Sequence, residues 1–142
     1  MIDMNPAIFK ELFRSAPFIV ELGLELESFG TGECVTSLNL EQRHLQQNGF
    51  VHAGVQATMA DHTAGTAAGT LAAEGRQVMT IEFKISFFRA AKGERLVCRA
   101  KVIKPGRKFS FVESEVFCLS LGEERLVAKA SATMAILAPA DE

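Results

Sequence analysis

A long run of small side chains, residues 53–73, restricts the fold of this chain more than any other feature. The run contains neither lysine nor arginine and predicts one long helix, which Gly75 would end because helices commonly stop at glycine. Alanine and glycine occur on all sides of this helix, so strands can approach it closely. An interior glycine costs about 1 kcal/mol of helix propensity relative to alanine, and close packing is the expected compensation. We therefore expect a central helix against which a sheet packs.

Segments that alternate between polar and apolar residues occur on both sides of this run, as is typical of strands. They lie near 22–29, 33–40, 79–88, 95–104, 108–119 and 125–137. Tight turns between consecutive strands, such as Gly30-Thr31-Gly32, predict an antiparallel sheet. Within 79–88, alternation puts one set of residues on the core face: Ile81, Phe83, Ile85 and Phe87.

A short helix is predicted at the beginning of the chain. Asn5 and Pro6 are a capping residue and a proline at the first helical position, and Pro17 would end this helix. No repeat or linker interrupts the sequence. The prediction is a single α+β domain, residues 1–142, in which a six-stranded antiparallel sheet wraps around one long central helix, with a short N-terminal helix.

Charge and cysteine pattern exclude several classes of function. The formal net charge is -2, whereas general nucleic-acid binding requires a strongly basic domain. Cys34, Cys98 and Cys118 lie in strand-like runs without a C-x-x-C pair, which favours reduced core cysteines over disulfides or zinc. No signal peptide is evident around Asp3, and Asp61 makes the small-residue run unsuitable as a membrane span. We expect a cytoplasmic protein that binds neither nucleic acid nor membrane.

Asp61 is the only carboxylate in the run 53–73. It lies about two turns into the helix, beyond the reach of a capping role. An ionised carboxylate is costly away from water, so a carboxylate inside an alanine-rich helix is a candidate catalytic acid or base. The alternative is a solvated carboxylate on an open face of the helix.

His52, Ala53 and Gly54 stand at the start of the same helix. The first N–H groups of a helix have no partner within it and lie at the positive end of its dipole, so they can bind a developing oxyanion. Asp61 follows Ala53 by eight residues, or ~12 Å along the axis, which is far for one carbonyl to bridge within one chain. A partner chain across a two-fold axis would solve this problem. His52 itself suits a structural hydrogen bond as well as a catalytic role.

The other histidines carry less weight. His44 lies in a polar loop, and His62 would point about 100° away from Asp61 around the helix. Neither is expected to act in catalysis. No two metal ligands recur at helical spacing around Asp61, so we expect no metal site.

The stretch QQNGFVHAGVQATMADHTAG resembles the signature of hotdog-fold thioesterases of the phenylacetate-pathway (PaaI-like) type. In that family an amide residue precedes a Val-His-Gly-Gly-like turn that opens the central helix. An acidic residue follows nine positions after the histidine, as Asp61 follows His52. The runs MTIEFKISFFRAAKGE and KPGRKFSFVESEV resemble a later strand and hairpin of the family. The resemblance covers nearly the whole chain and implies a hotdog-fold acyl-coenzyme A (acyl-CoA) thioesterase.

The resemblance also implies roles for individual residues. Asp61 resembles the family's catalytic base or nucleophile, and the Ala53 backbone N–H resembles its oxyanion donor, with a methyl group where the family has glycine. Thr80 matches a residue that helps to hold the attacking water, although strict alternation puts it opposite the face of Ile81. His52 belongs to the same catalytic group.

The family's active-site amide corresponds to Gln46, six positions before the histidine, and Asn48 is a rival for that role. Asn48, Gly54 and Gly65 are candidate substrate-binding residues. Basic residues around two turns are candidates for the phosphates of coenzyme A or for a solvated rim: Arg89, Lys92, Lys104, Arg107 and Lys108. Three phenylalanines suit either an acyl pocket or the core: Phe50, Phe87 and Phe88.

The active site of the family lies between two chains, with the helix start from one and the carboxylate from the other. Its dimers commonly pair into tetramers. The resemblance therefore implies a homodimer, and beyond it a homotetramer, with no cofactor because coenzyme A is part of the substrate.

Three other functions are alternatives for this chain. A non-catalytic acyl-CoA sensor on the same fold would bind its ligand without releasing free thiol. Hotdog hydratases use a histidine with a carboxylate on a different loop pattern, to which this chain shows no convincing match. A purely structural dimeric protein would leave the spacing of Gln46, His52 and Asp61 as a coincidence.

Overall fold

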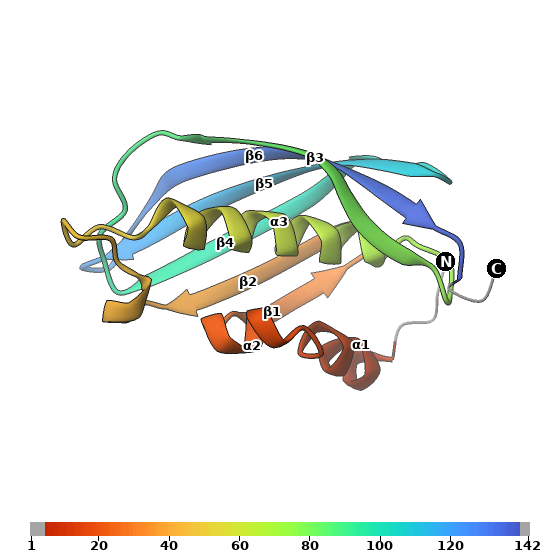
Figure 1. The fold of residues 1–142 in the computed structure, drawn as a ribbon, viewed down its shortest axis with the longest axis horizontal. Coiled ribbons are helices and arrows are strands. Elements are labelled where there is room, and N and C mark those ends of the chain that lie inside the picture. The colour runs from red at the N-terminus through yellow and green to blue at the C-terminus, as the bar shows by residue number, and fades with distance from the viewer. Residues whose placement is uncertain (1–4, 140–142) are drawn as a thin grey trace.

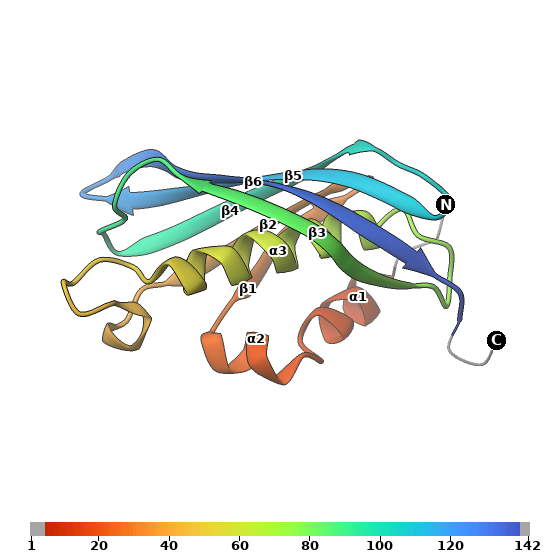
Figure 2. The same ribbon diagram turned by 45° about the horizontal axis from the view of Figure 1, so that its top comes forward.

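The computed structural model describes residues 5–139, so the ends of the predicted 1–142 domain, Asp3 included, lie outside the described residues. The elements in chain order are α1 (Pro6–Phe13), α2 (Pro17–Leu22), β1 (Glu25–Gly30), β2 (Glu33–Asn39), the 3₁₀ turn η1 (Gln42–His44), α3 (Ala53–Gly69), β3 (Gln77–Phe87), β4 (Arg95–Lys104), β5 (Phe109–Ser120) and β6 (Glu123–Leu137). The strands form one antiparallel sheet in the order β1-β2-β4-β5-β6-β3, which curves over α3 (Figures 1 and 2). The predicted hotdog architecture is confirmed.

The N-terminal region holds two helices where the sequence predicted one. Pro17 does not simply end the first helix but occupies the first turn of α2, where a missing N–H costs nothing. Gly23, with φ of 91°, ends α2 in the left-handed conformation. The strand predicted near 22–29 therefore begins only at Glu25, and Leu22 belongs to the helix.

The central helix α3 is shorter than predicted and is buried on one side only. It ends at Gly69, and Gly75 adopts its φ of 80° in the turn that follows. The buried side faces the sheet and consists of Gln56, Met59, Ala60, Thr63, Ala64, Ala67 and Ala68. The opposite side, with Asp61, is partly exposed. The expectation of close packing all around the helix is therefore wrong.

Buried hydroxyl groups fix α3 to the sheet. Thr63 Oγ1 lies 2.7 Å from Thr36 Oγ1 of β2, and Ser114 Oγ of β5 donates a 2.8 Å hydrogen bond to the Ala60 carbonyl. These contacts satisfy polar groups that would otherwise be buried without partners. They set the rotation of the helix, and with it the direction of Asp61. No helix among residues 5–139 has the length and apolar character needed to cross a membrane.

The three cysteines are free and buried, as the sequence predicted. Burial raises the pKa of the Cys34 and Cys98 thiols to about 12. It also raises the pKa of the Cys118 thiol. All three therefore stay protonated at neutral pH.

A β-bulge in β3 changes which residues face α3. The register of β3 against β6 shifts between Thr80 and Glu82, so that one extra residue, Ile81, enters the strand. Because side chains alternate with a period of two, the extra residue puts Thr80 on the same face as Phe83. The predicted core position of Ile81 is wrong: its side chain is 57% exposed. Phe87, at the strand end, is also exposed, and only Phe83 and Ile85 of the predicted set pack against the core.

Candidate active site

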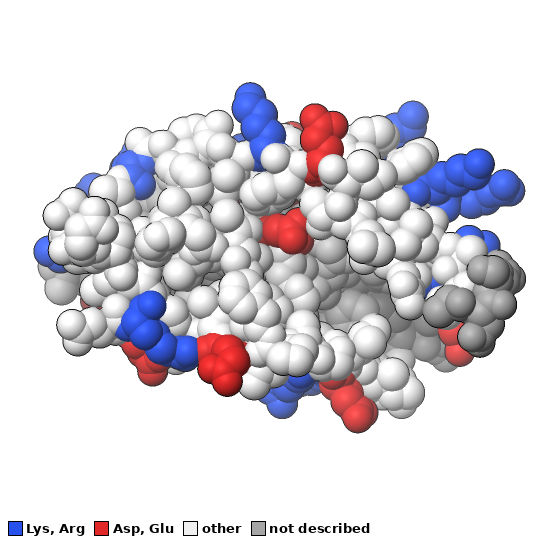
Figure 3. Space-filling view, viewed as in Figure 1, with Lys and Arg blue, Asp and Glu red and all other residues white. Residues whose placement is uncertain are grey.

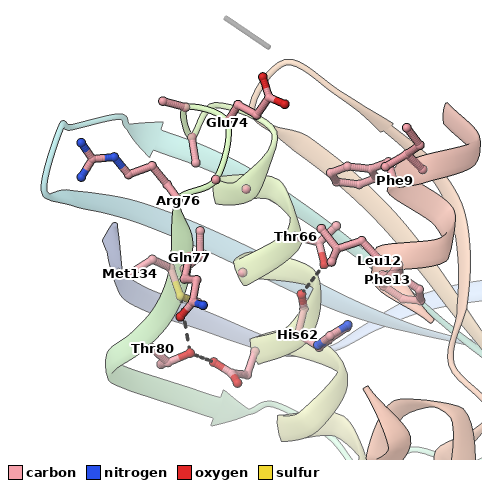
Figure 4. A pocket seen from close by; sticks show the side chains of 18 of the residues that line it. Phe9, Leu12, Phe13, His62, Thr66, Glu74, Arg76, Gln77, Thr80 and Met134 are labelled. Atoms are coloured by element: carbon pink, nitrogen blue, oxygen red, sulfur yellow. Dashed lines mark hydrogen bonds between the residues drawn. The ribbon is translucent and has the colours of Figure 1, made fainter. Parts of the chain in front are cut away.

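Asp61 lies on the partly exposed side of α3 and is held by β3. The Thr80 hydroxyl donates a 2.6 Å hydrogen bond to Asp61 Oδ1 (Figure 4). The bulge makes this contact possible, because without the extra residue Thr80 and Phe83 could not both face the helix. A carboxylate that accepts such a bond has one oxygen fixed and the other available for a ligand.

A cavity of about 1080 Å³ opens beside Asp61, between α1 and the second half of α3. The space-filling view shows the molecule hollowed over this region (Figure 3). Its walls are largely apolar and include Ile8 and Leu12 of α1, Gly65 of α3 and Met134 of β6. The carboxylate therefore faces a space that can hold a hydrocarbon group.

His62 also lines this cavity and was missed by the sequence reasoning. Its ring meets the Phe13 ring edge-on, with 4.8 Å between centroids, and its Nε2 is buried without a hydrogen-bond partner among the described residues. Burial lowers the pKa of His62, against the opposing effect of the nearby Asp61 carboxylate. The ring is thus neutral at pH 7 and is part of the apolar wall. In the sequence, the sign that His62 could belong to the site is its position directly after Asp61.

The start of α3 carries a backbone donor that no other group uses. His52 caps the helix, since its Nδ1 accepts a 2.8 Å hydrogen bond from the Gly54 N–H. A Cβ on Gly54 would lie 3.0 Å from that nitrogen, which explains the glycine. The Ala53 N–H has no acceptor among the described residues. This contact supports the structural role of His52. Among the described residues, the free donor at the helix start is the Ala53 N–H.

A second cavity, of about 470 Å³, surrounds this donor. It brings together the predicted residues Gln46, His52, Ala53 and Arg89, with Phe50 and Phe87 at its wall. Asn48 is exposed and is not among the lining residues, although its N–H donates to Gln46 Oε1. The geometry thus favours Gln46 over Asn48 as the amide near the donor.

Two buried polar residues near the second cavity were not singled out from the sequence. Gln56 lines the cavity, is only 4% exposed, and leaves its Oε1 without a partner among the described residues. His44, treated above as incidental, is buried: its Nδ1 accepts the Glu41 N–H and its Nε2 lies 2.8 Å from the Leu22 carbonyl. These bonds fasten the loop before α3 to α2. Neither residue belongs to a spacing pattern that marks it as part of a site.

The donor and the carboxylate face different cavities of the same chain. Ala53 and Asp61 are eight residues apart, or ~12 Å along the helix axis, and no residue lines both cavities. One substrate carbonyl cannot reach both groups within one chain.

The predicted basic residues also divide into two groups. Arg89 and Lys92 precede β4, whereas Lys104, Arg107 and Lys108 lie at its other end. A strand of ten residues spans roughly 30 Å, so the two groups cannot hold one phosphate together within one chain. Arg89 alone lines the cavity around Ala53. Phe88, beside it, is exposed.

One curved antiparallel sheet packed on a single central helix, with a carboxylate on the free side of that helix, defines a protein of the hotdog class. Comparison with known proteins supports this assignment and narrows it. A family model described as "Thioesterase superfamily" matches residues 48–124. A thioesterase family protein of known structure from Silicibacter pomeroyi is 34% identical, with a TM-score of 0.89 over 91% of this chain and 95% of that one.

Two further relatives agree. Human acyl-coenzyme A thioesterase 13 is 26% identical over 111 residues, which cover 77% of this chain and 79% of the human protein. The structure of a phenylacetic acid degradation-related protein from Ralstonia eutropha is 25% identical and covers 89% of this chain and 98% of its own, with a TM-score of 0.76. The chain belongs to the thioesterase superfamily, and the protein is a thioester hydrolase.

Proposed function

We propose that this protein hydrolyses acyl-CoA thioesters to the free acid and coenzyme A, at sites shared between two copies of the chain. The observation that carries the proposal is the separation of the Asp61 carboxylate from the Ala53 N–H into two cavities on one helix. Each cavity supplies half of what thioester hydrolysis requires. Two chains related by a two-fold axis would supply two complete sites.

The edge strand β3 is suited to join the two chains. It ends the sheet on one side, so its outer backbone groups have no strand partner among residues 5–139. Thr80, next to Asp61, lies near the beginning of β3, and Phe87, in the wall of the second cavity, lies at its end. Antiparallel pairing of β3 with the partner's β3 would set the beginning of one strand beside the end of the other. The Asp61 cavity of one chain would then adjoin the Ala53 cavity of its partner.

The reaction at such a site can be written with the groups described. The carbonyl oxygen of the thioester accepts the N–H of the partner's Ala53, which stabilises the negative charge that develops there. Asp61 removes a proton from water, whose oxygen bonds to the carbonyl carbon, and Thr80 keeps the carboxylate in position. The carbon–sulfur bond then breaks, and the thiolate of coenzyme A leaves and takes up the proton. In the other form of the reaction, Asp61 attacks the carbonyl carbon directly and the thiolate of coenzyme A leaves, after which water hydrolyses the acyl–aspartyl anhydride to the free acid and restores the carboxylate.

Pairing of dimers into a tetramer is supported by the outer face of the sheet. Large apolar side chains are exposed there on three strands: Met79 and Ile81 of β3, Ile103 of β4, and Phe109 and Phe111 of β5. Exposed apolar groups of this size are typical of interaction surfaces. We propose that this face joins two dimers, that the protein acts in the cytoplasm, and that it needs no cofactor besides the coenzyme A of its substrate.

Complementation between two inactive variants tests the shared site. Asp61→Asn removes the base. Ala53→Pro removes only the backbone donor, since proline is tolerated at the first helical position and His52 has the ψ of 136° that suits a residue before proline. Each variant alone is expected to be nearly inactive. Co-expressed in equal amounts, they form mixed dimers with one intact and one doubly defective site, so activity per chain returns to about a quarter of wild type.

The readout is thiol release from acyl-CoA, with co-expressed wild type and Asp61→Asn as the reference mixture. A mixed sample no more active than its two parents would show that carboxylate and donor act within one chain, against the proposal. Binding of acyl-CoA by the wild type without any thiol release would instead support the non-catalytic sensor.

A further inference from the structure

We infer that the cavity beside Asp61 holds the acyl chain of the substrate, and that Gly65 and Gly69 set how long that chain can be. The inference rests on the proposed thioesterase reaction and adds the substrate class: straight acyl chains of medium length. It starts from the cavity and from the side of α3 that forms its floor.

Asp61, Gly65 and Gly69 are spaced four residues apart, so they lie one above the other on one side of α3, and all three line the cavity. From Asp61 to Gly69 the helix rises ~12 Å. An extended hydrocarbon advances roughly 1.3 Å per carbon, so this floor matches about eight to ten carbons. A chain whose carbonyl stands at Asp61 can lie along the two glycines.

The packing of the protein does not require either glycine. A Cβ on Gly69 would meet nothing within 4 Å, and one on Gly65 would meet only the Met134 methyl group at 3.9 Å. At Gly93 and Gly106, by contrast, a Cβ would lie 2.1 Å from a backbone oxygen. Gly65 lies inside α3, where glycine is costly relative to alanine, and Gly69 is the last residue of the helix. The space that they leave at Gly65 and Gly69 is therefore unused by the chain and open to a ligand.

The other walls of the cavity suit a hydrocarbon. Helix α1 covers the floor and is anchored by Phe9, whose ring centroid is 4.1 Å from that of Phe29. Ile8 and Leu12, both largely exposed to solvent, line the cavity from this helix. The Thr66 hydroxyl is already bonded to the His62 carbonyl (Figure 4). The apolar walls thus offer burial for methylene groups and few free polar partners.

The far end of the cavity is lined by the turn after α3 and the first residues of β3, from Ala72 to Val78. This turn carries the charged residues Glu74 and Arg76, and the Arg76 side chain points away from the cavity (Figure 4). The charged residues among the described lining residues are therefore Asp61 at one end of the cavity and Glu74 and Arg76 at the other, and the methylene groups between them would meet apolar walls.

Substitution at the end of the floor tests the inference. The kcat/KM for thiol release is measured for straight acyl-CoAs of about four to twelve carbons. Gly69→Leu fills the far part of the groove and removes burial from about four methylenes, so the ratio of decanoyl-CoA to butanoyl-CoA activity should fall roughly 100-fold. Gly65→Leu, closer to Asp61, should shorten the accepted chain further. Gly30→Leu is the matched control, because Gly30 also has open space around it but lies outside the cavity.

The outcomes separate this inference from the proposed function. The wild type is also assayed with an aryl acyl-CoA: thiol release from none of the substrates would refute the proposed function, whereas release from the aryl substrate alone would refute only the inference. Activity in the wild type with an unchanged decanoyl-to-butanoyl ratio in folded Gly69→Leu would refute the inference alone. Should the leucine variant not fold, Gly69→Ala adds a single methyl to open space and improves helix propensity, and its ratio decides the question. A changed molecular mass with an unchanged ratio would assign the cavity to a second copy of the chain and refute the inference as well.

Discussion

The two cavities along α3 differ in chemistry although they share one helix. Both have largely apolar walls, and the difference lies in the reactive groups that they present. The cavity at the helix start presents the Ala53 N–H, which has no acceptor among the described residues, together with the Arg89 guanidinium. The cavity beside the second half of α3 presents the Asp61 carboxylate and is the larger of the two. This difference is what the proposed site requires, because the donor of one chain and the carboxylate of the other would act on one carbonyl.

Loss of the carboxylate should have the largest effect. Asp61→Asn keeps the size of the side chain but removes the base, so kcat should fall at least ~100-fold while folding is retained. Thiol-release kinetics measure the loss, and thermal unfolding checks the fold. Glu11→Gln, the same chemical change on the exposed side of α1, is the matched control. An unchanged rate in folded Asp61→Asn would remove the cavity beside Asp61 from the catalytic site.

Loss of the donor should have the next largest effect. Ala53→Pro deletes the N–H in the cavity at the helix start, and an oxyanion donor typically contributes ~100-fold to kcat. Because Ala53 is the first residue of α3, the helix should remain intact. Ala53→Gly, which keeps the N–H and removes only the methyl group, is the control. Equal activity in the proline and glycine variants would mean that this N–H does not contact the reacting carbonyl.

A smaller effect is expected at Thr80. Thr80→Val removes the hydroxyl that holds Asp61 Oδ1 and should lower kcat about tenfold, the scale of one hydrogen bond to a charged group. Thr58→Val removes a comparable hydroxyl, bonded to the Gly54 carbonyl at the other end of α3, and should change kcat little. If both variants lost activity equally, the effect would lie in the helix and not in the position of the carboxylate.

The smallest expected effect is a pH dependence of stability from His62. Burial holds its pKa in the folded protein below the ordinary value of 6.5, so the unfolded chain binds more protons once the pH falls below about 6.5. The contribution of His62 to the free energy of unfolding should therefore be constant above pH 7 and should decrease as the pH falls from about 6.5 towards the folded pKa. Urea unfolding at several pH values measures this slope. His62→Phe keeps an aromatic ring against Phe13 and should reduce the slope; an unchanged slope would place its source elsewhere.

Much of this protein could be predicted from its sequence, because the periodicity of apolar residues indicates helices and strands and the spacing of His52 and Asp61 indicates the catalytic segment. The succession of strands along the chain, the central helix and the candidate Asp61 follow from such patterns. The position of Thr80 does not, since one extra residue in β3 reverses the alternation and leaves no mark in the composition.

The ends of the elements and the role of the glycines were also beyond the sequence. Pro17 suits the end of one helix and the start of another equally well, and only the tertiary structure decides between them. Gly65 and Gly69 suggest close packing until the structure shows the empty space beside them. Such space depends on how α1 lies over α3, which no local pattern encodes.

The burial of the three cysteines has a practical consequence for the thiol-release assays. Reagents that detect released coenzyme A react with thiolates, and Cys34, Cys98 and Cys118 are buried and protonated at neutral pH. The folded protein should therefore contribute no background colour of its own. A variant whose core opens exposes these thiols, and its slow labelling in the absence of substrate would measure how often the sheet and α3 separate.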